Sequence, residues 1–182
     1  MRIISGLWRG RALIAPAGEA TRPTADRVRE ALFSMLASRV GSFHDLRVLD
    51  GFAGTGALGL EALSRGAAHC TFVERDAEAL KALKTNIAKC TIGTTLRPDV
   101  IAAPVESVGT APLPCDIILL DPPYGEGLAQ PALTRLAERG WIAPGALISV
   151  ETSRKEVLDT PYEVLATRDH GKARLHLMRA PA

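Results

Sequence analysis

The most informative feature of the sequence is a buried strand that stops at chemically useful residues. The apolar run IILL (117–120) is followed at once by DPPY, residues 121–124, and then by the turn GEG. Two consecutive prolines cannot continue the hydrogen-bond ladder of a sheet. The strand therefore ends at a carboxylate, a rigid stretch of backbone and an aromatic ring.

Asp121, Pro122 and Tyr124 are suited to hold an exocyclic amine of a nucleobase for methylation. Such a nitrogen is a poor nucleophile because its lone pair is delocalised into the ring. If the Asp121 carboxylate and the Pro122 carbonyl each accept one N–H, the lone pair is free to point at a methyl donor. Stacking on Tyr124 would add roughly 1–3 kcal/mol, and a base in a folded nucleic acid must be turned out to reach the pocket. Taken alone, DPPY could also be only a rigid turn.

A second group of residues surrounds the loop after the first predicted strand, in VLDGFAGTGALGLEAL. Asp50 ends the strand, Gly54 and Gly56 lie between it and a helix, and Glu74 follows 18 residues after Gly56 at the end of the next strand. Glycines let a ligand touch bare backbone beside a helix N-terminus, and an acid at this distance suits ribose hydroxyls. The pattern alone fits a nicotinamide enzyme, an adenosyl-cofactor enzyme or a structural turn.

Asp50 and DPPY favour the adenosyl cofactor. A carboxylate directly before the loop would repel a pyrophosphate, but it could face the ammonium and sulfonium groups of S-adenosylmethionine. A dehydrogenase has no evident use for DPPY at the end of a strand. Cys115, after Pro114, opens its strand and so lies at the wrong end of the sheet to be the nucleophile of a cytosine C5 methyltransferase. The histidines and cysteines form no metal-ligand pattern, so we expect no metal.

An alternating α/β chain is needed to bring these residues together. Strands are expected at 46–50, 70–74, 99–103, 116–120 and 146–151, helices at 57–65, 76–89 and 128–139, and two further strands at 162–167 and 173–178. Fully apolar strands between helices are typical of a parallel sheet covered on both faces. We therefore expect a doubly wound, Rossmann-like α/β fold that is mostly parallel and ends in an antiparallel hairpin. Asp50, Glu74 and Asp121 would then lie along one rim, at the carboxyl ends of the strands.

The chain is long enough for one core and a small N-terminal extension. It has 182 residues, 47% of them apolar, with no run long enough to span a membrane and no signal-peptide stretch at its start, so a cytoplasmic protein is expected. Residues 1–24 predict a hairpin or arm, and a helix follows from Thr24. We divide the chain into an extension at 1–45 and a main domain at 46–182.

The net charge of +2 hides an uneven distribution. Residues 1–47 carry a balance of +4 and residues 168–182 of +3, whereas the segment between them carries −5. Two basic ends around an acidic body fit a polyanion bound at the periphery, although an Arg-rich solvated surface would look the same. Trp8, beside two arginines, could stack on RNA, but a lone Trp in a short hairpin more often anchors the hairpin to the body.

The chain resembles the class I S-adenosylmethionine-dependent methyltransferases, and more narrowly the RsmD family of bacterial 16S ribosomal RNA guanine-N2 methyltransferases. The resemblance spans nearly the whole chain through MRIISGLWRGRAL, RPTADRVREALFSML, LDGFAGTGALGLEALSRGA, FVERD, LLDPPY, GWIAPGALISVE and GKARLHLMR. It implies a seven-stranded sheet and methyl transfer from S-adenosylmethionine to the N2 amine of a guanine. The implied substrate is 16S rRNA in an assembled or assembling 30S subunit, and we expect a monomer.

The same resemblance implies roles for individual residues. The cofactor would be bound by Asp50, Phe52, Gly54, Gly56 and Glu74, with Glu74 contacting the ribose. The guanine amine would be held by Asp121, Pro122 and Tyr124. The RNA would be contacted by Arg9, Arg11, Arg22, Arg27 and Arg29. The residue that contacts adenine after the third strand is left open. Asp99 has the right chemistry, whereas the spacing to DPPY favours Ala103-Pro104-Val105.

Three other functions stay open. DPPY would serve an adenine-N6 or cytosine-N4 DNA methyltransferase, but such enzymes usually carry a large target-recognition domain, and only 58 residues follow Tyr124. A non-catalytic RNA-binding assembly factor would not need the intact set of Asp50, glycines, Glu74 and DPPY. A nicotinamide oxidoreductase would be distinguished by its cofactor.

Overall fold

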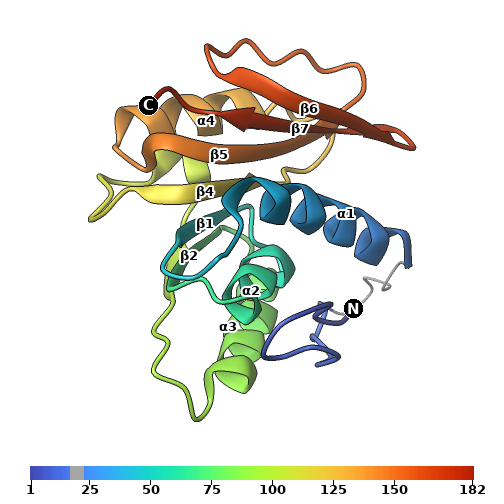
Figure 1. The fold of residues 1–182 in the computed structure, drawn as a ribbon, viewed down its shortest axis with the longest axis vertical. Helices are drawn as coiled ribbons and strands as arrows, with labels where there is room; N and C mark the ends of the chain where they lie inside the picture. Colours follow the sequence, from blue (N-terminus) through green and yellow to red (C-terminus); the bar gives the residue numbers. More distant parts are fainter. Residues whose placement is uncertain (17–22) are drawn as a thin grey trace.

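The computed structural model describes residues 1–16 and 23–182, and its centre is one seven-stranded sheet (Figure 1). The strands are β1 (Arg47–Gly51), β2 (His69–Glu74), β3 (Asp99–Ala102), β4 (Cys115–Leu120), β5 (Ile142–Ser153), β6 (Glu163–His170) and β7 (Ala173–Arg179). Their order across the sheet is β3-β2-β1-β4-β5-β7-β6. Strands β1 to β5 are parallel, and β7 runs antiparallel between β5 and β6. The predicted doubly wound fold with a C-terminal antiparallel hairpin is confirmed.

Helices cover both faces of the sheet. They are α1 (Pro23–Val40), α2 (Ala57–Ser64), α3 (Ala77–Thr91), α4 (Ala129–Glu138) and the short 3₁₀ helix η1 (Val105–Ser107). Buried side chains of α1, α2 and α3 share one hydrophobic cluster, whereas those of α4 and η1 share a second. In Figure 1, α1 crosses in front of the strands and α4 lies behind them.

The central strands are apolar throughout because both of their faces are covered. In β4, Ile117 and Leu119 belong to the cluster on the α2 side, and Ile118 and Leu120 to the cluster on the α4 side. Successive side chains of a strand point to opposite faces, so an uninterrupted apolar run fills two cores. Polar groups can then reach solvent where a strand ends, and this makes the carboxyl ends of the strands the place for a site.

The C-terminal strands are longer than the sequence predicts. β5 begins earlier than expected, at Ile142, and its pairing with β4 contains a register shift. β6 continues to His170, which pairs with Ala173, so the hairpin of β6 and β7 turns at Gly171-Lys172. These extra residues carry the hairpin turn to the rim that holds DPPY.

The N-terminal arm, residues 1–16, packs on α2 and α3. Trp8 is 4% exposed, and its backbone N–H donates to the Ser64 Oγ of α2 (2.9 Å). The backbone N–H of Ile14 donates to Asn86 Oδ1 of α3 (2.8 Å). The interpretation of Trp8 as an anchor is confirmed. The arm therefore shares a hydrophobic cluster with the sheet, and the division of the chain at residue 45 stays a prediction.

Candidate active site

Three carboxyl groups meet at one rim of the sheet, at the ends of β1, β2 and β4. Since β1 lies between β2 and β4, Asp50 in β1 has Glu74 on one side and Asp121, directly after β4, on the other. Burial raises the pKa of Asp50 well above its usual range, and the charges of Asp121 and Glu74 raise it further. The fold therefore gathers these three residues as the strand ends predict.

A cavity of about 510 Å³ opens at this rim, and we call it the loop cavity. It is bordered by the loop after β1, the end of β2, the segment after β3 and DPPY. The predicted site residues that line it are Phe52, Gly54, Glu74, Asp121, Pro122 and Tyr124. Two motifs that are far apart in the sequence thus form one site.

Gly54 and Gly56, the two glycines of the loop predicted to bind the cofactor, have different surroundings. Gly54 has φ +55°, and a Cβ there would meet no atom within 4 Å, so its bare backbone is open to the loop cavity. Gly56 has φ +86° at the start of α2, and a Cβ there would lie 2.6 Å from Leu83 Cδ1. Gly56 therefore serves the packing of α2 on α3, and it is not among the residues that line the loop cavity, so its predicted contact with a ligand stays a prediction.

Phe52 keeps an uncommon backbone conformation in the same loop. Its φ of 60° is in the left-handed region, which costs a non-glycine residue roughly 1–2 kcal/mol. Hydrogen bonds from the Ala53 N–H to the Val73 carbonyl (2.9 Å) and from the Gly54 N–H to Glu74 Oε2 (2.7 Å) hold the loop in this form. Strain of this kind is concentrated at ligand sites, where the surrounding structure enforces it.

Asp50 is a buried carboxyl group with one unused oxygen. It is 1% exposed, and its Oδ2 accepts a hydrogen bond from the backbone N–H of Gly59 in α2 (2.9 Å). Its Oδ1 is also buried and has no hydrogen-bond partner among the described residues. A buried acceptor without a donor is costly, so this oxygen suits a cationic or N–H-bearing ligand group.

Glu74 is held in place by backbone donors. Its Oε2 accepts from Gly54, as above, and its Oε1 accepts from the N–H groups of Arg75 and Asp76, both at 2.9 Å. The carboxylate is half-buried on the wall of the loop cavity. A carboxylate fixed in this way can still accept further hydrogen bonds, and it loses no side-chain freedom when a ligand binds. It therefore suits the hydroxyl groups of a ribose.

Asp121 and Tyr124 also line a second cavity, of about 660 Å³, which we call the hairpin cavity. It lies between α1, DPPY, the end of β5 and the turn between β6 and β7. Its charged and polar lining residues include Arg29, Asp121, Tyr124, Glu151, His170 and Lys172. Asp121 therefore stands where the loop cavity and the hairpin cavity meet.

Glu151, near the carboxyl end of β5, lies at the site although no sequence motif indicates a role for it. Its Oε1 accepts a hydrogen bond from the Tyr124 hydroxyl (2.5 Å). Desolvation by the surrounding protein raises the pKa of Asp121 to about 7 although the residue is exposed at the rim, and the charge and a hydrogen bond of Glu151 contribute to that rise. Burial and the same Glu151 contact raise the pKa of Tyr124. The position of Glu151 in the sequence could have indicated a role at the site. Because β5 is parallel to β4, an acid near the carboxyl end of β5 lies at the same rim as Asp121.

The arginines predicted to contact RNA have different surroundings. Arg9 and Arg27 are exposed. Arg11 is also exposed, but its guanidinium donates to the Lys89 carbonyl (2.9 Å) at the C-terminus of α3. Arg22 lies outside the described residues. Contact between RNA and the exposed arginines of the arm and of α1 therefore stays a prediction.

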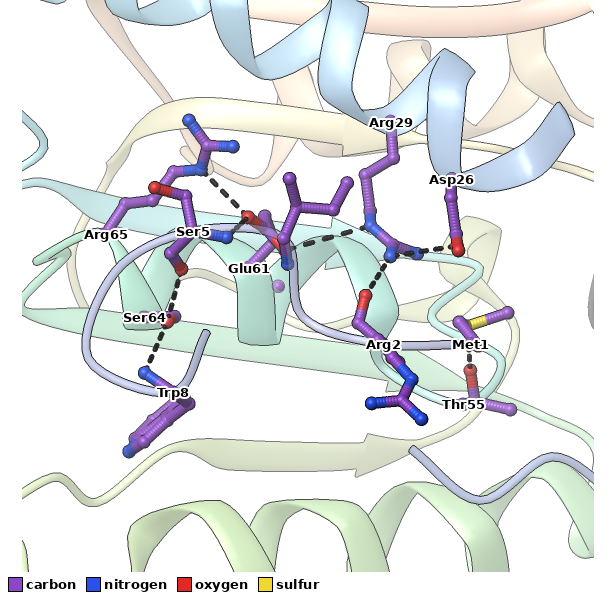
Figure 2. Close-up of polar contacts among 12 residues, drawn as sticks. Met1, Arg2, Ser5, Trp8, Asp26, Arg29, Thr55, Glu61, Ser64 and Arg65 are labelled. Carbon is purple, nitrogen blue, oxygen red and sulfur yellow. Dashed lines mark hydrogen bonds and ion pairs between the residues drawn. The ribbon is translucent and has the colours of Figure 1, made fainter. Parts of the chain in front are cut away.

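Arg29 requires a correction, because its side chain is 5% exposed and bonded within the protein. It donates to the carbonyl of Arg2 in the arm, pairs with Asp26 (3.2 Å) and lies 3.8 Å from Glu61 Oε2 (Figure 2). A guanidinium whose partners are all internal connects elements of the fold. Its position on the buried face of α1 explains the difference from Arg27.

Glu61 is the centre of this buried group. It is 0% exposed, and its two carboxylate oxygens accept from the backbone N–H groups of Ile4 (2.9 Å) and Ser5 (3.0 Å). Arg65 Nε donates to the same carboxylate at 3.0 Å (Figure 2). One side chain of α2 therefore ties the arm to α1 beside both cavities.

The two alternatives in the segment after β3 lie at different ends of the strand. Ala103, Pro104 and Val105 line the loop cavity. Asp99 begins β3 at the opposite end and pairs with His69 (3.0 Å). The alternative favoured by spacing is therefore the one that reaches the site.

Neither a metal cluster nor a membrane span is found in the part of the chain that the structure covers. No three His, Cys, Asp or Glu side chains there are grouped so that they could hold an ion. None of the helices described has the length and apolar character needed to cross a bilayer. Cys115 opens β4 and is buried, at the end of the strand away from DPPY.

The strand order, the glycine loop and the carboxylate rim define a class I methyltransferase. An rRNA methyltransferase from Streptomyces viridochromogenes superposes with a TM-score of 0.71 at 18% identity, over 92% of this chain and 88% of that chain. At this identity the similarity is one of fold. A solved protein from Escherichia coli is nearer, with a TM-score of 0.86 and 37% identity over 100% of this chain and 98% of that chain.

The chain belongs to the family described as "Conserved hypothetical protein 95", whose model matches residues 1–179. Curated relatives bear the name "Ribosomal RNA small subunit methyltransferase D". The one from Haemophilus influenzae is 42% identical over 168 residues, 88% of this chain and 83% of the relative. The one from Escherichia coli K12 is 41% identical over 160 residues, 88% of this chain and 78% of the relative. The resemblance to the RsmD family is confirmed.

Proposed function

We propose that this protein transfers a methyl group from S-adenosylmethionine to the exocyclic N2 amine of a guanine in 16S rRNA of the small ribosomal subunit. The observation that carries the proposal is the position of Asp121, on the shared wall of the loop cavity and the hairpin cavity. A transfer reaction needs donor and acceptor in adjacent sites with the reacting atoms between them.

The loop cavity supplies groups that fit the cofactor. S-adenosylmethionine would provide an activated methyl group on a cationic sulfur. Glu74, on the wall of the cavity, offers a fixed carboxylate for hydroxyl groups. Asp50 is not part of the cavity lining, but its unpaired buried Oδ1 at the neighbouring strand end favours a cation. Phe52 and the open backbone of Gly54 complete the wall. An acidic rim of this kind would repel the pyrophosphate of a nicotinamide dinucleotide.

The residues of DPPY orient the amine. Asp121 and the carbonyl of Pro122 would each accept one of its hydrogens, which directs the nitrogen lone pair toward the loop cavity. No strong base is required before attack, because the nitrogen gains positive charge during transfer and then releases a proton readily. The Tyr124 ring, 55% exposed and held through its hydroxyl by Glu151, offers a face on which the base can stack.

The names of the relatives and the basic ends of the chain support an rRNA substrate. The exposed Arg9 and Arg27, together with Arg11 and Arg22, would contact phosphates around the flipped nucleotide. We infer that the substrate is an assembled or assembling 30S subunit, that the protein acts as a monomer, and that it works in the cytoplasm where such subunits form.

The test is transfer of labelled methyl from S-adenosylmethionine to small subunits, free 16S rRNA and DNA, followed by nucleoside mass spectrometry. N2-methylguanosine from the RNA is the expected product. N6-methyladenosine or N4-methylcytosine from DNA would overturn the proposal in favour of a DNA methyltransferase. No transfer to any of the three would favour the non-catalytic assembly factor.

The role of Asp121 is tested in the same assay with Asp121→Ala. We expect transfer to fall by roughly 10²–10³-fold, the usual effect of removing a preorganised hydrogen-bond group. Asp116→Ala is the matched control, because Asp116 is at the other end of β4, where its carboxylate accepts from the Arg47 backbone N–H (2.9 Å). Near-normal transfer by Asp121→Ala would show that this carboxylate does not orient the amine.

A further inference from the structure

Glu151 occupies the position next to Asp121 on the substrate side of the rim. Leu120 pairs with Val150 in the parallel register of β4 and β5. Asp121 and Glu151, the next residue of each strand, are therefore neighbours across the sheet. Glu151 lines the hairpin cavity, whereas the lining of the loop cavity does not include it. Its carboxylate can therefore contact a substrate in the hairpin cavity, and not the cofactor in the loop cavity.

The two carboxyl groups form a short row of acceptors. Tyr124 donates to Glu151 Oε1 at 2.5 Å, and Asp121 follows Leu120, the β4 residue that pairs with Val150 just before Glu151. Glu151 is half-buried, so part of it remains accessible from the hairpin cavity. A row of two adjacent acceptors matches a ligand edge that carries adjacent donors.

We propose that Glu151 selects guanine by accepting the N1–H of the base while Asp121 and the Pro122 carbonyl hold its N2 amine. This inference rests on the proposed function. Guanine has a ring N–H directly beside its exocyclic amine, whereas adenine and cytosine have an unprotonated ring nitrogen at the same place. A carboxylate there accepts from guanine and repels the lone pair of the other two bases, so it works by attraction and by exclusion.

The far side of the hairpin cavity is consistent with this pattern. Across the sheet the order runs from β4 through β5 to the hairpin of β7 and β6, so the turn with His170 and Lys172 lies beyond Glu151. His170 Nε2 is buried without a hydrogen-bond partner among the described residues. These two side chains bring donors to the side where the guanine O6, an acceptor, follows N1–H along the base edge.

The experiment compares Glu151→Gln with the wild type on two target bases. Small subunits are rebuilt with either guanine or 2-aminopurine at the nucleotide that the wild type methylates. 2-Aminopurine keeps the 2-amine but has an unprotonated N1. We expect the wild type to prefer guanine by roughly 10- to 100-fold, the value of a hydrogen bond to a charged group. In Glu151→Gln, whose amide can donate to N1, this preference should fall at least tenfold.

Two controls separate selection from structure. Glu163→Gln makes the same chemical change on β6 at the opposite end of the sheet, where Glu163 pairs with Arg179, and it should leave the preference unchanged. Tyr124→Phe removes the hydroxyl that bonds Glu151 and keeps the ring, so it should change the rate on both bases alike. Thermal unfolding and binding of S-adenosylmethionine by calorimetry check that Glu151→Gln folds.

The outcomes distinguish this proposal from the function on which it rests. If the wild type makes no N2-methylguanosine, the proposed function fails and the role of Glu151 fails with it. If the wild type makes it but Glu151→Gln keeps the wild-type preference for guanine, only the role of Glu151 is wrong. If Tyr124→Phe collapses the preference as Glu151→Gln does, Glu151 acts by anchoring Tyr124 and not by contacting the base.

Discussion

Asp50 is held where its negative charge is unfavourable to the folded chain. It is buried, one of its oxygens has no partner among the described residues, and two other carboxyl groups lie close to it. Each of these features raises the pKa of the group, and together they disfavour its ionised form. Groups retained under such conditions are characteristic of ligand sites, where a bound partner of opposite charge compensates for them.

We therefore predict that Asp50→Asn separates stability from binding. The amide can keep the hydrogen bond from Gly59, and it removes a group whose ionisation is unfavourable in the folded chain. The free energy of unfolding at neutral pH should stay the same or rise by roughly 0.5–2 kcal/mol, while affinity for S-adenosylmethionine falls at least tenfold. Urea unfolding and calorimetry measure the two quantities. A variant that is clearly less stable and binds the cofactor normally would contradict this account.

Asp121 should give the protein a characteristic pH dependence. Its pKa is about 7 in the folded chain against its usual 3.8, because of desolvation first and then the charge and hydrogen bond of Glu151. The folded state thus holds a proton that the unfolded chain releases. The contribution of Asp121 to stability is complete below about pH 3.8 and is lost as the pH rises through about 7.

The measurement is a carbon NMR titration of the Asp121 carboxyl in the ligand-free protein, with unfolding followed at several pH values. Tyr124, Glu151 and Asp50 are the titratable groups that face it. Glu151→Gln should lower the titration midpoint, since burial alone then raises the pKa. In Asp121→Asn, the decrease in the free energy of unfolding that Asp121 causes as the pH rises toward 7 should be absent. A midpoint near 4 in the wild type is incompatible with the prediction.

At the scale of elements, one buried carboxylate connects the arm, α1 and α2 beside the candidate site. Glu61 of α2 receives the arm through two backbone N–H groups and faces Arg29 of α1 (Figure 2). Both α1 and the arm border the hairpin cavity. Truncating one member of such a group leaves the others charged and buried, which is far more costly than removing a surface pair.

Arg27 and Arg29 give a matched pair of variants on one helix. Arg29→Ala should lower the free energy of unfolding by roughly 3–5 kcal/mol, because it leaves Glu61 with less compensation. Arg27→Ala should change it by less than about 0.5 kcal/mol, since the side chain is exposed, and should weaken RNA binding. Urea unfolding and a filter-binding assay check the two effects. Equal stability of the two variants would show that the buried group contributes little.

At the scale of the whole molecule, the two basic ends of the sequence meet at the hairpin cavity. Residues of α1, from the N-terminal basic segment, and His170 and Lys172, from the C-terminal one, line this same cavity. The insertion of β7 between β5 and β6 brings the second segment there. The lining of this cavity thus combines Lys172 with the carboxyl groups of Asp121 and Glu151, a mixture of charges that suits a nucleic acid whose target base is turned inward.

Much of this site could be predicted because it depends on local patterns. Strand ends follow from apolar runs that stop, and a parallel sheet puts the carboxyl ends of its strands on one side, so Asp50, Glu74 and Asp121 were expected at one rim. Arg29 was misjudged because helical spacing alone does not show which face of α1 is covered. The polar Arg29 lies on that covered face, where Glu61 compensates for its charge.

By itself, the sequence determined the order of elements, the glycine loop, DPPY and the charge of each segment, since all of these are properties of neighbouring residues. Only the tertiary structure decided which residues share a cavity. It placed Gly56 in a packing contact and Ala103 to Val105 at the site. It also set Glu151 beside Asp121. The reason is physical: pairing between β4 and β5 and the choice of buried helix face are fixed by long-range packing, to which residues distant in the sequence contribute together.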